Sequence, residues 1–152
     1  MNSPLMKAFG DERIAAGEQR LVVDLGACTG MDSTFMGTLG GLATRISAQP
    51  GGALQIAAVG QRNRNSLEDL GLDFFMEIEP PEAPWHHQLE ATRRALKPVG
   101  PKLAGGKIQQ AQHVLEAHQI LAGANDENAQ KFATVVKLLG VELEKKLEGQ
   151  QP

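Results

Sequence analysis

The chain of 152 residues is predicted to form an α/β fold with a small sheet and helices packed on it, followed by a helical extension. Three observations predict this. Short apolar runs alternate with amphipathic segments over the first half of the chain, as is typical of β-α-β units. A segment rich in proline and glycine follows, and only helix-period patterns come after it. We therefore divide the chain into an α/β domain at residues 1–79, a linker at 80–106 and a helical hairpin at 107–148.

The α/β domain is expected to begin with a helix in which Ser3 is the N-cap and Pro4 lies in the first turn, and Gly17 ends it. Strand and helix then alternate: strands at 21–25, 53–59 and 74–78, and helices at about 33–48 and 66–70. The run at 21–25 is continuously apolar, which indicates a strand covered on both faces. Strands joined by helices at this spacing form right-handed parallel crossovers.

The linker contains five prolines and three glycines, with one short helix expected around residues 85–89. Beyond it, apolar residues recur at helical spacing from Ile108 to Ala122 and again from Phe132 to Leu147. Asp126 is the expected N-cap of the second helix. Two such helices form a hairpin, which can fold back on the core, pair with its copy in a homodimer, or hold a partner.

Composition and charge exclude several classes of protein. The net charge is −3 and only six residues are aromatic, so nucleic-acid binding is not expected. Cys28 is the only cysteine, and four histidines beside one cysteine do not predict a metal site. No apolar run is long enough to cross a membrane, and the N-terminus has no secretory pattern. We therefore expect a cytoplasmic protein without a metal or cofactor.

The segment from Val23 to Gly30 is similar to the glycine-rich first motif of the Rossmann-like methyltransferases, which bind S-adenosylmethionine. Cys28 replaces the middle glycine of that motif and places a side chain where the cofactor would pass. The next strand also lacks the acidic residue that would hold the ribose. A small methyltransferase is therefore kept as the alternative.

Two further interpretations concern the start of the helix at 33–48. A helix N-terminus beside glycines can bind an anion, but no Gly-Lys-Ser/Thr sequence supports nucleotide hydrolysis. Ser33 could act as a nucleophile only with a base and an oxyanion hole nearby. The sequence Gly-x-Ser-x-Gly is absent, and the first histidine after Ser33 is His86, more than fifty residues downstream.

Taken together, four features resemble a STAS domain, the fold of the bacterial anti-sigma factor antagonists. The resemblance runs from about Ser3 to Glu79. Its features are the strand LVVDL, the junction Met31-Asp32-Ser33-Thr34, the glycine-dotted helix from Gly37 to Leu42, and the later segment Leu67-Glu68-Asp69-Leu70-Gly71-Leu72-Asp73.

This resemblance implies a protein-binding module and not an enzyme. Ser33 would be the regulatory phosphorylation site, and Asp32 would order the loop beside it. The partner would be an anti-sigma factor with serine kinase activity, captured while Ser33 is unmodified, and a serine phosphatase would reset the switch. The alternative is a purely structural role, in which Ser33 only caps its helix. A third interpretation keeps the STAS fold as a scaffold in another signalling or transport assembly.

The docking surface is expected to include Asp32 and Thr34. Arg62, Arg64 and Asn65, on the turn before the short helix, could add to it, although solvated side chains are an equal alternative. Glycines 37, 40 and 41 each weaken the helix by about 1 kcal/mol relative to alanine. That cost indicates close approach of another backbone, within the domain or from a partner.

The chain departs from the family pattern at its start. A STAS domain opens with two strands before its first helix, whereas this sequence begins directly in that helix. We expect in-frame codons upstream of Met1 to encode two short apolar strands. Otherwise the exposed sheet edge must be covered by the C-terminal helices or a second subunit.

Overall fold

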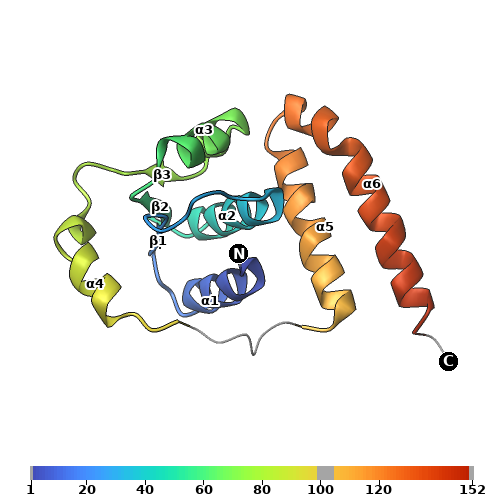
Figure 1. The fold of residues 1–152 in the computed structure, drawn as a ribbon, viewed down its shortest axis with the longest axis horizontal. Helices are drawn as coiled ribbons and strands as arrows, with labels where there is room; N and C mark the ends of the chain where they lie inside the picture. The colour runs from blue at the N-terminus through green and yellow to red at the C-terminus, as the bar shows by residue number, and fades with distance from the viewer. Residues whose placement is uncertain (1, 99–104, 151–152) are drawn as a thin grey trace.

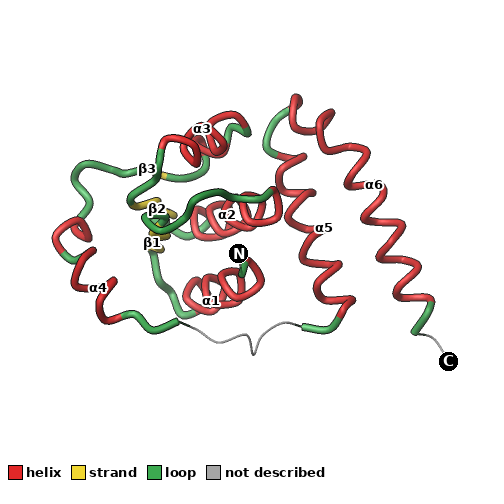
Figure 2. Tube along the Cα trace, in the orientation of Figure 1, coloured by secondary structure: helices red, strands yellow, loops and turns green. Residues whose placement is uncertain are grey.

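A computed structural model of the protein describes residues 2–98 and 105–150. Its centre is a parallel sheet of three strands in the order β1 (Arg20–Asp24), β2 (Ala53–Ala57) and β3 (Glu77–Ile78). In the register of the first pair, Leu21 lies opposite Leu54 and Val23 opposite Ile56. Figure 2 shows these short strands in yellow, surrounded by helices. The predicted α/β fold with a small parallel sheet is confirmed.

The prediction that the first strand is covered on both faces is wrong. Exposed and half-buried residues alternate along β1, and Val22 is 39% exposed. β1 lies at the edge of the sheet, whereas β2 lies in the middle and is buried from Leu54 to Ala57. The alternation shows that one face of β1 is packed and the other is open, so the continuous apolar run does not correspond to burial on both faces.

Three helices belong to the α/β half: α1 (Ser3–Ala15), α2 (Ser33–Ser47) and α3 (Gln61–Asp69). Asn2, not Ser3, is the N-cap residue of α1; Ser3 is already helical, and its side chain is buried. α1 ends before Gly17, which has a φ of +90°, as predicted.

The helix α3 is longer than the sequence indicated. It begins directly after Gly60 and not at Ser66. Arg62, Arg64 and Asn65 therefore lie within the helix and not on a turn before it. Their polar side chains hid the helical period, because only Asn63 and Leu67 of α3 are buried.

The core lies between α2 and the sheet. Leu39, Leu42 and Ile46 of α2 pack against Leu54 and Ile56 of β2, and all five side chains are essentially inaccessible to solvent. Beyond α3, Gly71 adopts a φ of +67°, and a 3-10 helix, η1 (Leu72–Phe74), follows it. The third strand is therefore shorter than the predicted 74–78, because η1 takes up its first residue.

The linker is more structured than predicted. The short helix expected at 85–89 overlaps a 3-10 helix, η2 (Pro84–His87), and a further helix that was not expected, α4 (Leu89–Ala95), follows it. Residues 99–104 lie outside the described part of the chain. Arg93 of α4 holds both carboxylate oxygens of Asp24, at 2.6 and 2.8 Å, and so ties α4 to the end of β1.

The C-terminal extension consists of α5 (Lys107–Gly123) and α6 (Asp126–Glu148), which pack against each other. α5 also packs on α2, while α6 lies on the outside (Figure 1). The N-cap of α6 is Asn125 and not Asp126: its Oδ1 accepts a hydrogen bond of 2.8 Å from the Asn128 backbone N–H. Among residues 2–98 and 105–150, no helix is long and apolar enough to span a membrane.

The Asn128 side chain is expected to stabilise the attachment of the hairpin. It is 1% exposed and donates a hydrogen bond of 2.9 Å to the Leu70 carbonyl at the end of α3. Asn128→Ala removes this donor, so the free energy of unfolding should fall by about 2 kcal/mol. Urea unfolding with Gln130→Ala, an exposed site on the same helix, as the control measures it. Equal midpoints for the two variants would mean that this hydrogen bond contributes nothing.

Candidate functional site

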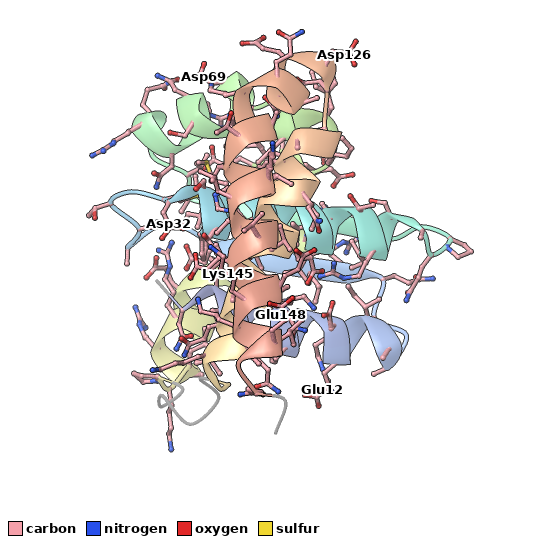
Figure 3. The ribbon with its side chains drawn as sticks, turned by 90° about the vertical axis from the view of Figure 1, so that its right-hand side faces the viewer. Glu12, Asp32, Asp69, Asp126, Lys145 and Glu148 are labelled. Carbon is pink, nitrogen blue, oxygen red and sulfur yellow. The ribbon has the colours of Figure 1, made fainter. Side chains whose placement is uncertain are left out.

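The junction between β1 and α2 presents Asp32 and Ser33 at a helix N-terminus. Asp32 is the N-cap residue: its backbone is extended, and its Oδ1 accepts a hydrogen bond of 2.7 Å from the Phe35 backbone N–H. The interpretation of Ser33 as the cap is therefore wrong, since Ser33 is the first helical residue. Its hydroxyl is left for other contacts. In Figure 3, Asp32 lies to one side of the hairpin, behind α6.

The Ser33 hydroxyl contacts a histidine from the other end of the chain. Its Oγ lies 2.9 Å from Nε2 of His118, a buried residue of α5. The other ring nitrogen of His118, Nδ1, lies 2.7 Å from the Val114 carbonyl oxygen. A carbonyl only accepts hydrogen bonds, so Nδ1 carries the proton in the neutral ring. Nε2 is then the acceptor, and the Ser33 hydroxyl donates to it.

A serine beside a histidine base is also the first step in building a nucleophilic site. In such sites a carboxylate orients the histidine and stabilises its charged form. Here the backbone carbonyl of Val114 takes that place, and the imidazole is buried between helices. We interpret the pair as a contact that holds the Ser33 hydroxyl in one direction.

A second histidine of α5 makes a similar contact one turn and a half earlier. His113 Nε2 lies 2.9 Å from Ser3 Oγ and 3.4 Å from Thr38 Oγ1. The Thr38 hydroxyl is already committed as a donor to the Thr34 carbonyl, at 2.7 Å. Burial lowers the pKa of His113, and nearby Lys7 acts in the same direction, while Glu116 opposes it. The α5 interface thus favours a neutral His113.

Stability is expected to fall on mild acidification because of His113. Its pKa is lowered in the folded protein from an ordinary value of 6.5. Below that value the unfolded chain binds a proton that the folded chain resists, so the free energy of unfolding is highest above it and decreases as the pH falls. Urea midpoints from about pH 7.5 to about pH 5 measure this slope above the carboxylate range. His113→Gln should flatten it; an unchanged slope would contradict this role.

The glycines of α2 face α5. A Cβ on Gly37 would lie 2.9 Å from Ala117 Cα and closer still to the Ala117 carbonyl, which real side chains do not tolerate. Atoms of Ile120 lie within 3.2 Å of the corresponding positions on Gly40 and Gly41. The sequence predicted close approach of another backbone at these glycines. That holds at Gly37, where α5 is the backbone, whereas Gly40 and Gly41 face the Ile120 side chain. Tight packing offsets the loss of helix propensity.

The other predicted docking residues are distributed differently. Thr34 lies half-buried beside Ser33. Arg62 is exposed, and its guanidinium carbon lies 3.9 Å from where a Cβ on Gly30 would be, so it approaches the loop before α2. Arg64 instead pairs with Glu79 at 2.6 Å, and Asn65 accepts a hydrogen bond of 2.7 Å from Gln61. The structure thus brings Arg62 to the Ser33 loop and engages Arg64 and Asn65 in local contacts.

Sequence reasoning missed Asn63, which lies between the three predicted residues. Asn63 is 2% exposed, and its Nδ2 donates a hydrogen bond of 2.8 Å to the Cys28 carbonyl, so α3 supports the loop that leads to Ser33. Its Oδ1 has no hydrogen-bond partner within the described residues. The spacing of 63, 67 and 70 puts Asn63 on the buried face of α3 and could have identified it.

The glycine-rich loop is occupied by a side chain of the protein itself. A Cβ on Gly26 would lie 2.5 Å from the Arg93 guanidinium, and the Gly26 N–H donates to Asp24. The hydrogen bonds from Arg93 lower the pKa of Asp24. Asp24 and Gly26, which resembled part of a cofactor motif, therefore lie against Arg93 of α4. In the described ranges, no three histidine, cysteine or acidic side chains gather as metal ligands.

Comparison with protein families gave one finding that bears on this site. The family model of the STAS domain matches residues 2–83, more than half of the chain. The match includes β1, α2 with Asp32 and Ser33, and α3, and it stops before η2 and the hairpin. Comparison with curated proteins gave no match, and comparison with solved structures gave none either.

Proposed function

Because the chain belongs to the STAS domain family, a family of signalling and binding modules, we propose that it is an anti-sigma factor antagonist switched by phosphorylation of Ser33. The unmodified protein captures an anti-sigma factor with serine kinase activity and so releases a sigma factor. Phosphorylation of Ser33 ends the capture, and a serine phosphatase restores it. The protein acts in the cytoplasm, without a cofactor and without an enzymatic activity of its own.

The observation that carries this proposal is the position of Ser33 as the first residue of α2, beside the capping Asp32. The first backbone N–H groups of a helix lack intrahelical partners, and the helix dipole favours negative charge there. A phosphate on Ser33 adds up to about two negative charges at that point. The N-terminus of α2 can therefore carry the modification.

The same charge is unfavourable for a partner. Asp32 is exposed and already negative, so phosphate on Ser33 concentrates negative charge on one small surface. A partner that covers Asp32, Thr34 and Ser33 would have to desolvate that charge. Arg62, exposed near the loop before α2, is the cation at the rim of this surface. Arg64 and Asn65 contribute less, because their side chains are engaged within the domain.

Mass spectrometry of the protein isolated from the cells that naturally produce it tests the modification. We expect a fraction of the chains to carry one phosphate, located on Ser33 by peptide fragmentation. The Ser33→Ala variant should carry none, whereas Thr34→Ala, the neighbouring hydroxyl, should keep it. Phosphate at another residue, or none in any growth phase, would contradict the proposal.

A further inference from the structure

The helical hairpin covers the same face of α2 that carries Ser33. His118 binds the Ser33 hydroxyl, the Ala117 backbone meets Gly37, and Ile120 lies over Gly40 and Gly41. These contacts extend along more than two turns of α2. Figure 1 shows α5 placed between α2 and α6, so the face points into the molecule and not into solvent.

The contact between α5 and α2 is tight. Only Ala117, His118 and Leu121 of α5 are buried. At the margin of this contact, the Glu116 carboxylate lies 3.8 Å from the Arg45 guanidinium and 3.9 Å from the Lys7 ammonium. All three side chains are partly exposed to solvent. α5 keeps a second interface, with α6, that does not involve α2. The hairpin therefore has packing of its own, and it is attached to the α/β half by this face of α5 and by the hydrogen bond from Asn128 to the Leu70 carbonyl.

The docked hairpin occupies the direction in which the Ser33 hydroxyl points. The hydroxyl hydrogen, which phosphorus would replace, points at His118 Nε2 across 2.9 Å. A phosphoryl group is much larger than the hydrogen it replaces, so in this direction it would overlap the imidazole of His118. The contact of Gly37 with Ala117 fixes how far α5 lies from α2, so α5 cannot move aside by a small step and keep this packing. The docked position of α5 therefore hinders modification of Ser33.

We propose that the α5–α6 hairpin is a tethered competitor for the partner of this domain. The inference rests on the proposed function, because it concerns access to the same Ser33. The groove that Gly37, Gly40 and Gly41 form on α2 accepts a helix with a small residue at its closest point, as α5 does with Ala117. A helix of the serine kinase with a small residue at that position is the partner that fits. It must displace α5, which acts at a high effective concentration.

A substitution at Gly37 tests whether α5 shields residue 33, and this test does not require a kinase. Gly37→Ala strengthens α2 as a helix but collides with the Ala117 backbone, so it should undock α5. Gly140→Ala is the matched control, since a Cβ on that α6 glycine meets open space. Both are made in a chain with Cys28→Ser and Ser33→Cys, and the reaction of the thiol with a maleimide is followed. We expect labelling about tenfold faster or more with Gly37→Ala. Equal labelling rates for the Gly37→Ala and Gly140→Ala variants would contradict the inference that α5 covers residue 33.

A reversible lock gives an independent measurement if Gly37→Ala fails to fold. A Cβ on Gly40 lies 3.2 Å from Ile120 Cγ2, within reach of a disulfide after Gly40→Cys and Ile120→Cys in a Cys28→Ser chain. The oxidised and reduced chains are incubated with ATP and soluble extract of the producing cells. We expect Ser33 phosphate only after reduction. Phosphate on Ser33 of the oxidised, disulfide-linked chain would contradict the proposal that the hairpin competes for access to Ser33.

The two proposals fail in different ways. One outcome is slow maleimide labelling of the chain with Gly37, together with equal Ser33 phosphorylation of the oxidised and reduced disulfide variant. It would overturn the proposal that the hairpin is a competitor, but it would leave the proposed function intact. Absence of Ser33 phosphate from the reduced lock and from the unsubstituted chain would overturn the proposed function, and with it the competitor, even where Gly37→Ala exposes the thiol.

Discussion

Removal of residues 105–152 is expected to destabilise the remaining chain strongly and to make it self-associate. Leu121 of α5 is 0% exposed and belongs to the same core cluster as Leu39 and Leu42 of α2. Loss of a buried leucine alone costs about 2–5 kcal/mol, a large part of the total stability of about 5–15 kcal/mol. The deletion also bares the glycine face of α2 and the apolar side chains beneath it, which favours aggregation.

Urea unfolding followed by circular dichroism, together with light scattering, measures both effects. The control is removal of residues 144–152 only, because the apolar residue lost there, Leu147, is already 44% exposed. We expect the control to unfold close to the full chain and the larger deletion to unfold at lower urea and to scatter more. A monomeric deletion variant with an unchanged midpoint would show that the hairpin is an appendage to an independent core.

Ser33→Asp is expected to abolish capture of the serine kinase, while Ser33→Ala preserves it. A carboxylate at the first residue of α2 places a second negative charge next to Asp32. An unpaired charge in a contact surface costs about 2–5 kcal/mol, which corresponds to about a thirtyfold loss of affinity or more. The alanine variant removes only the hydroxyl and its contact with His118, and it cannot be phosphorylated.

Circular dichroism and affinity capture with both variants check this prediction. Both should fold, because a negative charge is favourable at a helix N-terminus and alanine is a good helix former. Gln130→Glu is a control that adds the same charge at an exposed site of α6, away from the predicted docking residues. Capture by Ser33→Asp and Ser33→Ala with equal strength would contradict the switch.

Local patterns predicted most elements of the fold. The apolar period of α2 and its stop at Pro50 placed that helix within one residue, and Gly17 and Gly71 marked turns with positive φ. Errors arose where two local signals compete. Asn125 and Asp126 are both residue types that favour the N-cap position. In the structure Asn125 takes that position, and Asp126 is the first helical residue. The polar run from Gln61 to Asn65 hid the first turn of α3.

Contacts between distant residues could not be predicted from these patterns. Ser33 and His118 are 85 positions apart, and Asp24 and Arg93 are 69 apart. Each pair forms only because a helix outside the α/β domain packs in one position, which no local period specifies. The glycines at 37, 40 and 41 did indicate a closely packed neighbour, which is the backbone of α5 at Gly37 and the Ile120 side chain at the other two. They did not say which neighbour.

The affinity of the unmodified and the Ser33-phosphorylated protein for the kinase that modifies it tests the switch most directly. Isothermal titration calorimetry compares the two forms after each has been verified by intact mass. We predict tight binding of the unmodified protein and a loss of about thirtyfold or more on phosphorylation, for the electrostatic reason given above. Equal affinity of the two forms, or tighter binding of the phosphorylated one, would contradict the proposal that Ser33 controls capture.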